Sequence, residues 1–204
     1  MKTDDPNSED FYWTIEMRTE APSVHDVGAR EHTAELVLFH ENRGRIKSVG
    51  RAHFVVVPFG YSAASFLDCA DEVSSTTLAS AAFAASTVEI AGGAGMVYIS
   101  SVELDENIRG QNLGLFLVTN AVRALTDLAP EAVAVLEPSP FYADELDTAT
   151  RRKAVEKLSS HWTVAGFEFG ESDTDSEFMS VLAGEIKTTD PFPPVPPSIL
   201  DTLR

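Results

Sequence analysis

The strongest constraint on the fold is a turn rich in glycine and asparagine between two apolar segments near the middle of the chain. Residues 96–104 predict a central strand, and residues 113–128 repeat apolar side chains at helical spacing. The intervening turn, residues 109–114, therefore lies at the start of a helix, where consecutive backbone N–H groups meet the positive end of the helix dipole. This arrangement predicts a pyrophosphate site, the alternative being a turn whose glycines serve only close packing.

The remaining elements predict a mixed sheet of the α/β (α+β) class. Strands are expected in the N-terminal quarter, then two short helices in the Ala-rich region, a short buried parallel strand, a helix and a closing hairpin. The expected strands are residues 11–18, 35–40, 45–59, 96–104 and 132–136, with hairpin strands 166–169 and 177–182, and the expected helices lie within 62–86, at 113–128 and at 151–164.

The length and composition predict one domain. A chain of 204 residues with 44% hydrophobic residues buries a single core. We expect a disordered acidic leader at 1–10, the domain at 11–186 and an extended Pro-rich arm at 187–204. No apolar run is long enough for a membrane helix and no signal peptide is present, so we expect a cytoplasmic protein without membrane contact. One cysteine, Cys69, offers neither a disulfide nor a metal site.

The charge balance bears on partners. With 15 Lys and Arg against 32 Asp and Glu, the formal charge is −17. Such a chain repels nucleic acid at long range and attracts cationic small molecules or basic peptides, so no nucleic-acid partner is expected. The alternative is that the acidity serves only solubility.

The central turn resembles the acetyl-CoA motif of the GNAT acetyltransferases, Arg/Gln-x-x-Gly-x-Gly/Ala after a Leu-x-Val strand. Arg109 opens the motif, Asn112 stands at the place of the first glycine, Gly114 stands at the second, and 102–104 match the strand. Residues 136–141 and 157–167, followed by Phe178-Met179, resemble the second half of these domains. The resemblance covers residues 98–182.

The resemblance implies a GNAT-like mixed, mostly antiparallel sheet whose two central strands splay apart to admit acetyl-CoA. The Leu104 amide would face the thioester carbonyl, and the amides of 109–115 would hold the pyrophosphate. The implied cofactor-binding residues are Val102, Leu104, Arg109, Gly110, Gln111, Asn112, Leu113, Gly114, Leu115 and Trp162.

Four residues are candidates for proton transfer. Glu103, within the apolar strand, is the first candidate for the base, and Glu137 is the second. Many relatives carry a tyrosine as the general acid at the place of Trp162, and a tryptophan donates no catalytic proton. Either the thiolate leaves without a general acid, or His161 or Tyr142 is the replacement, although His161 also fits an ordinary helix surface.

The predicted function is transfer of an acetyl group from acetyl-CoA to a primary amine of a small molecule or a protein. The alternative is a catalytically silent acyl-CoA-binding or regulatory module, which Trp162 and Asn112 favour. A third possibility, a toxin-like acetyltransferase of charged tRNA, conflicts with the net charge. A homodimer is compatible with these expectations.

Overall fold

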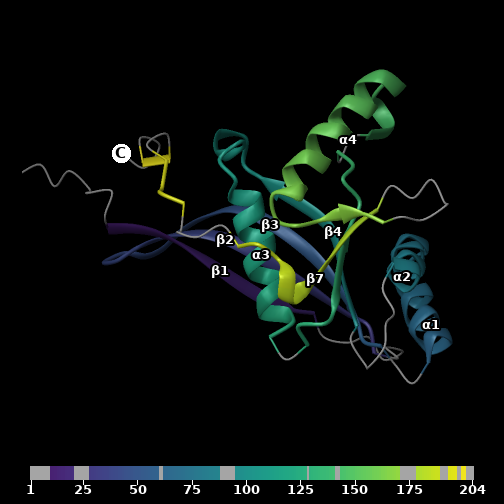
Figure 1. Cartoon of the computed structure of the whole chain (residues 1–204). Coiled ribbons are helices and arrows are strands. Elements are labelled where there is room, and N and C mark those ends of the chain that lie inside the picture. The colour runs from purple at the N-terminus through teal and green to yellow at the C-terminus, as the bar shows by residue number, and fades with distance from the viewer. Residues whose placement is uncertain are drawn as a thin grey trace, which may run out of the picture.

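The computed structural model describes residues 10–20, 28–59, 62–87, 95–127, 129–140, 143–170, 178–188, 193–196 and 199–200. In this part of the chain, seven strands form one sheet in the order β1-β2-β3-β4-β5-β7-β6 (Figure 1). Six strand neighbours are formed, and only β4 and β5 run parallel. The predicted mixed, mostly antiparallel sheet is confirmed.

The first three strands form an antiparallel meander. They are β1 (Phe11–Thr19), β2 (Arg30–His40) and β3 (Gly44–Val57). The sequence placed the start of the second strand at residue 35, whereas β2 begins at Arg30. The extra polar residues pair with β3, opposite Val56 and its neighbours, so pairing extends the strand beyond its apolar part.

The other four strands build the central parallel pair and the closing hairpin. They are β4 (Met96–Leu104), β5 (Val133–Leu136), β6 (Glu168–Phe169) and β7 (Met179–Leu182). The predicted parallel neighbours are confirmed, with Met96 opposite Val133 and Ile99 opposite Leu136. The hairpin strands pair antiparallel as expected, although both are shorter than predicted.

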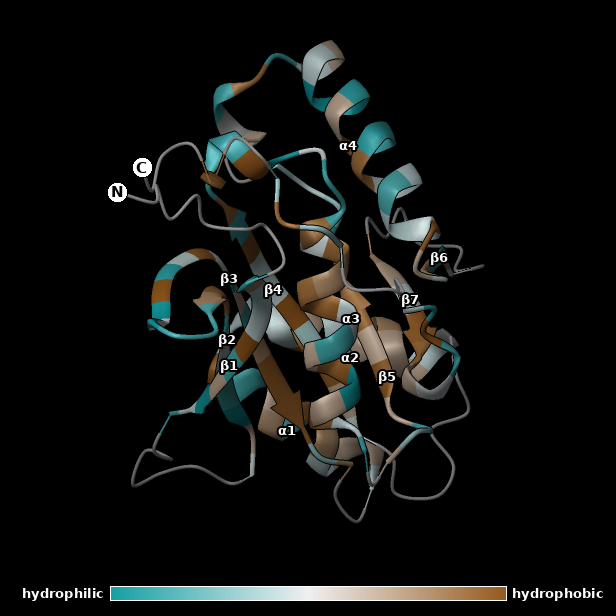
Figure 2. Ribbon diagram, turned by 90° about the vertical axis from the view of Figure 1, so that its left-hand side faces the viewer, coloured by the Kyte–Doolittle hydropathy of each residue, from teal (hydrophilic) through white to brown (hydrophobic). Residues whose placement is uncertain are grey.

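Helices cover both faces of the sheet. They are α1 (Ala63–Val73), α2 (Ser75–Thr87), α3 (Leu113–Leu125) and α4 (Thr148–Thr163), with short 3-10 turns at Glu106–Ile108, Ala143–Glu145 and Ala183–Glu185. α3 packs into the larger core on one face, and α1 with α2 packs into a second core on the other. Figure 2 shows α3 in front of the sheet, α1 and α2 behind it, and α4 projecting beyond it. None of the helices in the described ranges is long and apolar enough to span a membrane.

Local capping explains where three of these helices begin. Ser62 and Ser65 form a capping box at α1, and the Ser74 hydroxyl accepts a hydrogen bond from the Thr77 amide at α2. Asp147 accepts from the first amides of α4. Each cap satisfies backbone donors that the helix itself leaves without partners.

Described residues of the predicted C-terminal arm pack on the domain. Ile199 is only 2% exposed and belongs to the larger core, and Val195 and Leu200 pack against that core. These three described apolar residues thus contact the domain past the predicted boundary at 186. Of the predicted leader, only Asp10 lies within the described residues, where its carbonyl accepts a hydrogen bond from the Glu41 amide.

Candidate functional site

The two parallel strands separate because one of them cannot continue. β5 ends at Leu136, and the following residues include Pro138 and Pro140, which lack the N–H that a strand ladder requires. β4 continues through residues 100–104 beyond its last partner on β5. A stretch of β4 edge therefore faces a gap, as the resemblance implied.

A β-bulge adjusts β4 where the gap opens. His53 pairs with Ser101 and Phe54 with Ile99, so Ser100 is the additional residue. A bulge increases the local twist and re-aims the residues that follow it.

One hydrogen bond shows which edge of β4 the backbone amides face beyond the bulge. The Asp105 amide donates to the Val49 carbonyl of β3 at 2.9 Å. Backbone groups of successive strand residues alternate between the two edges. The amides of Leu104 and Val102 consequently face away from β3, toward the gap.

The turn that follows β4 has two residues in the left-handed region. Gly110 has φ +80°, and Asn112, the cap of α3, has φ 59°. Asparagine tolerates this conformation better than most residues with a side chain. The first helical amides, from Leu113 to Leu115, have no carbonyl within their own helix to donate to, and they point out of its N-terminus. This geometry suits an anion.

Arg109 and Gly114 also have structural roles in this turn. The Arg109 Nε donates to the Leu104 carbonyl at 3.1 Å, which fastens the turn to the end of β4. A Cβ on Gly114 would lie 3.6 Å from Leu104 Cδ1 and 3.8 Å from Val102 Cγ1. Gly114 thus faces the strand, so its lack of a side chain serves helix–strand packing, and only its amide is oriented for an anion.

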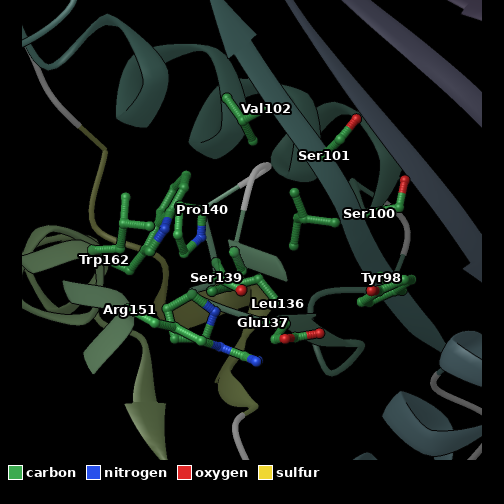
Figure 3. A pocket seen from close by; sticks show the side chains of 14 residues that line it. Tyr98, Ser100, Ser101, Val102, Leu136, Glu137, Ser139, Pro140, Arg151 and Trp162 are labelled. Atoms are coloured by element: carbon green, nitrogen blue, oxygen red, sulfur yellow. The ribbon is translucent and has the colours of Figure 1, made fainter. Parts of the chain in front are cut away.

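A cavity of about 340 Å³ lies where the strands separate (Figure 3). Its walls come from β4, from the segment after β5 and from α4. The described lining residues are Tyr98, Ile99, Ser100, Ser101, Val102, Leu136, Glu137, Pro138, Ser139, Pro140, Ala143, Arg151, Leu158 and Trp162.

Three of these side chains determine the chemistry of the cavity. Glu137 and Arg151 are its carboxylate and its guanidinium, and Figure 3 shows their charged ends turned toward one another. Tyr98 is 5% exposed. Burial, and secondarily the nearby Glu137, raises the pKa of the Tyr98 phenol to about 12, so it stays protonated at neutral pH.

Only some of the predicted site residues lie at the cavity. Glu137 and Trp162 line the cavity, and Trp162 is 7% exposed against Phe167. Glu103 is exposed, is not among the described lining residues and lies opposite Arg51 of β3, on the sheet face away from α3.

The candidate replacements for the missing tyrosine acid have different positions. His161 is half-buried on α4 and contacts the edge of Trp162, but it does not belong to the described lining. Burial, and secondarily Lys157, lowers the pKa of His161. Tyr142 lies outside the described residues.

Sequence reasoning missed Tyr98, Ser100, Ser101 and Arg151 as site residues. The Ser-Ser pair inside an apolar strand was the available signal for the bulge, because two hydroxyls there are costly without a cleft or a kink. Arg151 had no local signal, since helix periodicity does not reveal what a helix faces. Among the described residues, no cluster of three or more His, Cys, Asp or Glu is arranged to hold a metal.

Comparison with known proteins finds similarity only among solved structures. No family model and no curated protein matches the chain. A variant of the AtaT toxin bound to the C-terminus of the antitoxin AtaR and acetyl-CoA is 14% identical, with a TM-score of 0.40, over 85% of this chain and 94% of that one. AtaT complexed with acetyl-methionyl-tRNAfMet is 13% identical, with a TM-score of 0.41, over 83% and 94%. The KacTA–DNA complex is 10% identical, with a TM-score of 0.41, over 93% and 98%. Because this similarity is so distant, the functional argument rests on the site itself.

Proposed function

We propose that this chain is an acetyl-CoA-dependent N-acetyltransferase of the GNAT type that acts on a primary amine. The observation that carries the proposal is the edge of β4 at residues 100–104, which pairs with no strand on the side of β5 among the described residues. It leads from the cavity to the left-handed turn before α3. One extended ligand with a pyrophosphate at one end and a reactive group at the other fits this layout.

Backbone groups would hold most of the donor. The gap-facing amides of Val102 and Leu104 and the carbonyl of Val102 would bind the pantetheine arm as an added strand. The amides of 110–115 would receive the pyrophosphate at the α3 N-terminus. The sequence motif and the positive φ angles of Gly110 and Asn112 both support this assignment.

The reaction needs one group that accepts a proton from the amine and one source of the proton that the leaving thiolate gains. The neutral amine attacks the thioester carbon, the new C–N bond forms, the C–S bond breaks, and the amine's proton leaves as the thiolate gains one. Glu137 is the better acceptor for the amine's proton because it lines the cavity. Glu103 lies on a sheet face outside the cavity, so it would have to act through a water molecule.

The second candidate function is a silent acyl-CoA-binding module. The observation in its favour is Trp162, which lines the cavity at the place where the resemblance predicts a tyrosine acid. Tyr98, the buried phenol of the cavity, is a neutral donor that would stabilise the oxyanion rather than protonate a thiolate readily.

The decisive experiment measures release of free CoA from acetyl-CoA with a panel of amines. The panel holds polyamines, amino acids and peptides with free N-termini, and also charged tRNA, because AtaT has been seen with acetyl-methionyl-tRNAfMet. We expect Glu137→Gln to lower the rate by about 100-fold with acetyl-CoA affinity unchanged, whereas Glu103→Gln stays within a few-fold of the wild type.

The two variants also separate the alternatives. A large rate loss in Glu103→Gln alone would make Glu103 the base, as first predicted. Tight acetyl-CoA binding without turnover on any acceptor would favour the silent module.

A further inference from the structure

One buried hydroxyl group of the cavity has no hydrogen-bond partner among the described residues. It belongs to Tyr98, whose side chain is 5% exposed and lines the cavity near the residue at which β5 ends. Figure 3 shows its oxygen turned toward the side of the cavity that holds Glu137. A buried polar group without a partner costs free energy unless a ligand or water satisfies it. The phenol therefore indicates a ligand that brings a hydrogen-bond acceptor to this end of the cavity.

Packing does not account for the hydroxyl of Tyr98. Its ring belongs to the second core, on the α1 and α2 side of the sheet, and meets Phe178 edge to face with the ring centroids 6.4 Å apart. The other described aromatic side chains of this core are all phenylalanines, namely Phe59, Phe66, Phe83 and Phe178. A phenylalanine at position 98 would fill the same space and leave no hydroxyl to satisfy.

The serine hydroxyls of the cavity differ from that of Tyr98. Ser100 is exposed, and its hydroxyl donates to the His53 carbonyl at 3.3 Å. Ser101 and Ser139 are half-buried, so solvent reaches their side chains. Among the described lining residues, Tyr98 alone presents a hydroxyl from a buried side chain.

The length of the donor brings its thioester toward Tyr98. Leu104 is fastened to the pyrophosphate turn, and the four residues from there to Ser100 span about 13 Å of strand. Pantetheine has about twelve bonds between its phosphate oxygen and its sulfur, as many as four residues of extended backbone. An arm that follows the β4 edge from the turn thus delivers its sulfur to the part of the cavity beside Ser100, two positions from Tyr98.

We propose that the reacting carbonyl of the donor lies at the Tyr98 end of the cavity, where the phenol donates a hydrogen bond to its oxygen. This assignment rests on the proposed acetyl transfer and adds a catalytic residue to it. It replaces Leu104, the donor that the resemblance implied, which is not among the described lining residues. The Leu104 amide faces the gap nearer the turn, where the pantetheine arm begins.

The phenol would act as a hydrogen-bond donor and not as an acid. When the amine nitrogen adds to the carbonyl carbon and loses its proton to the general base, the C=O electron pair moves to the oxygen, and Tyr98 stabilises that oxyanion. When the C=O bond forms again, the C–S bond breaks and the sulfur leaves as a thiolate, which water protonates. Burial raises the pKa of Tyr98 to about 12, well above that of a thiol, so the phenol keeps its proton throughout. Trp162 is then compatible with turnover, because no acid is needed at its place.

The test compares acetyl-CoA with S-ethyl-CoA, in which a methylene group replaces the carbonyl. Calorimetry measures the affinity of each. We expect the wild type to bind acetyl-CoA about three- to tenfold more tightly, the net effect of one neutral hydrogen bond. Tyr98→Phe keeps the ring and should bind the two ligands equally. The control is Tyr12→Phe, the same change at a tyrosine that is 49% exposed on β1, and it should keep the wild-type difference.

Two further measurements report on the carbonyl itself. The infrared stretch of an isotope-labelled thioester carbonyl should lie at lower frequency in the wild type than in Tyr98→Phe, because a hydrogen bond weakens the C=O bond. With any accepted amine, kcat of Tyr98→Phe should fall about 100-fold, as expected for loss of one oxyanion donor, while its affinity for S-ethyl-CoA stays that of the wild type.

Equal affinity of the wild type for the two ligands would overturn the assignment of Tyr98, as would a difference that survives in Tyr98→Phe. Neither outcome contradicts acetyl transfer. Failure of the folded wild type to bind acetyl-CoA would contradict the proposed function, and the role of Tyr98 with it. Thermal unfolding of each variant verifies that it is folded.

Discussion

At the scale of single residues, the site depends on backbone conformation and burial more than on catalytic side chains. Asn112 adopts a left-handed conformation, which favours glycine, and it still begins α3. Trp162, which stands where the resemblance to the GNAT acetyltransferases implies a tyrosine, lines one wall of the cavity. Tyr98, which no motif indicated, is the buried phenol of that cavity.

Tyr98 should make stability depend on alkaline pH. Its pKa in the folded state, about 12, exceeds the ordinary value of 10.0, so the folded protein holds this proton more tightly than the unfolded chain. The stabilisation is complete below pH 10 and is lost as pH rises through about 12. We expect the free energy of unfolding to fall in this window by up to about 1.4 kcal/mol per pH unit more in the wild type than in Tyr98→Phe.

Urea unfolding at a series of pH values measures this difference, and the ultraviolet absorbance of tyrosinate identifies the last phenol to ionise. The same alkaline slope in Tyr98→Phe as in the wild type would refute the assignment.

At the scale of elements, strand ends create the site. β5 ends where prolines begin, and β4 runs on toward α3. The start of β4 is equally constrained, because a Cβ on Gly95 would collide with the Val57 carbonyl oxygen and lie 3.0 Å from Pro58 Cα. Only glycine at position 95 lets the start of β4 lie this close to the end of β3.

Gly95→Ala should therefore destabilise the fold by about 1–3 kcal/mol, since the contact is with backbone that cannot rotate away. Gly114→Ala is the control, because its Cβ meets Leu104 Cδ1 at 3.6 Å, an ordinary contact, and alanine gains up to about 1 kcal/mol in a helix. Urea unfolding of both variants decides the point. Equal stability of Gly95→Ala and the wild type would show that the strands separate without cost.

At the scale of the whole molecule, ligand binding should couple to stability. Acetyl-CoA bound only by the folded chain should raise the free energy of unfolding by about 2.7 kcal/mol at 100 times its dissociation constant. Gln111→Glu should reduce the affinity at least about tenfold by repelling the pyrophosphate, although a carboxylate near a helix N-terminus does not weaken the helix.

Thermal unfolding with and without acetyl-CoA measures both effects, and Gln111→Ala controls for loss of the native amide. An undiminished rise in Gln111→Glu would mean that the pyrophosphate binds elsewhere.

The sequence by itself determined the types and order of the elements, because helical and strand periodicities are local. It also located the turn before α3, since glycine and asparagine mark the left-handed positions. The cofactor end of the candidate site could be predicted for that reason.

Only the tertiary structure decided what faces the cavity. Tyr98 and Arg151 both line the cavity although 53 positions separate them in the sequence. Glu103 lies on the face of β4 away from α3, and the alternation of side chains along a strand does not show which face other elements cover. Ile199 likewise belongs to the core through contacts with residues distant in the sequence. Register, bulges and covered faces depend on pairing between distant segments, whereas spacing along the chain reports only the local period.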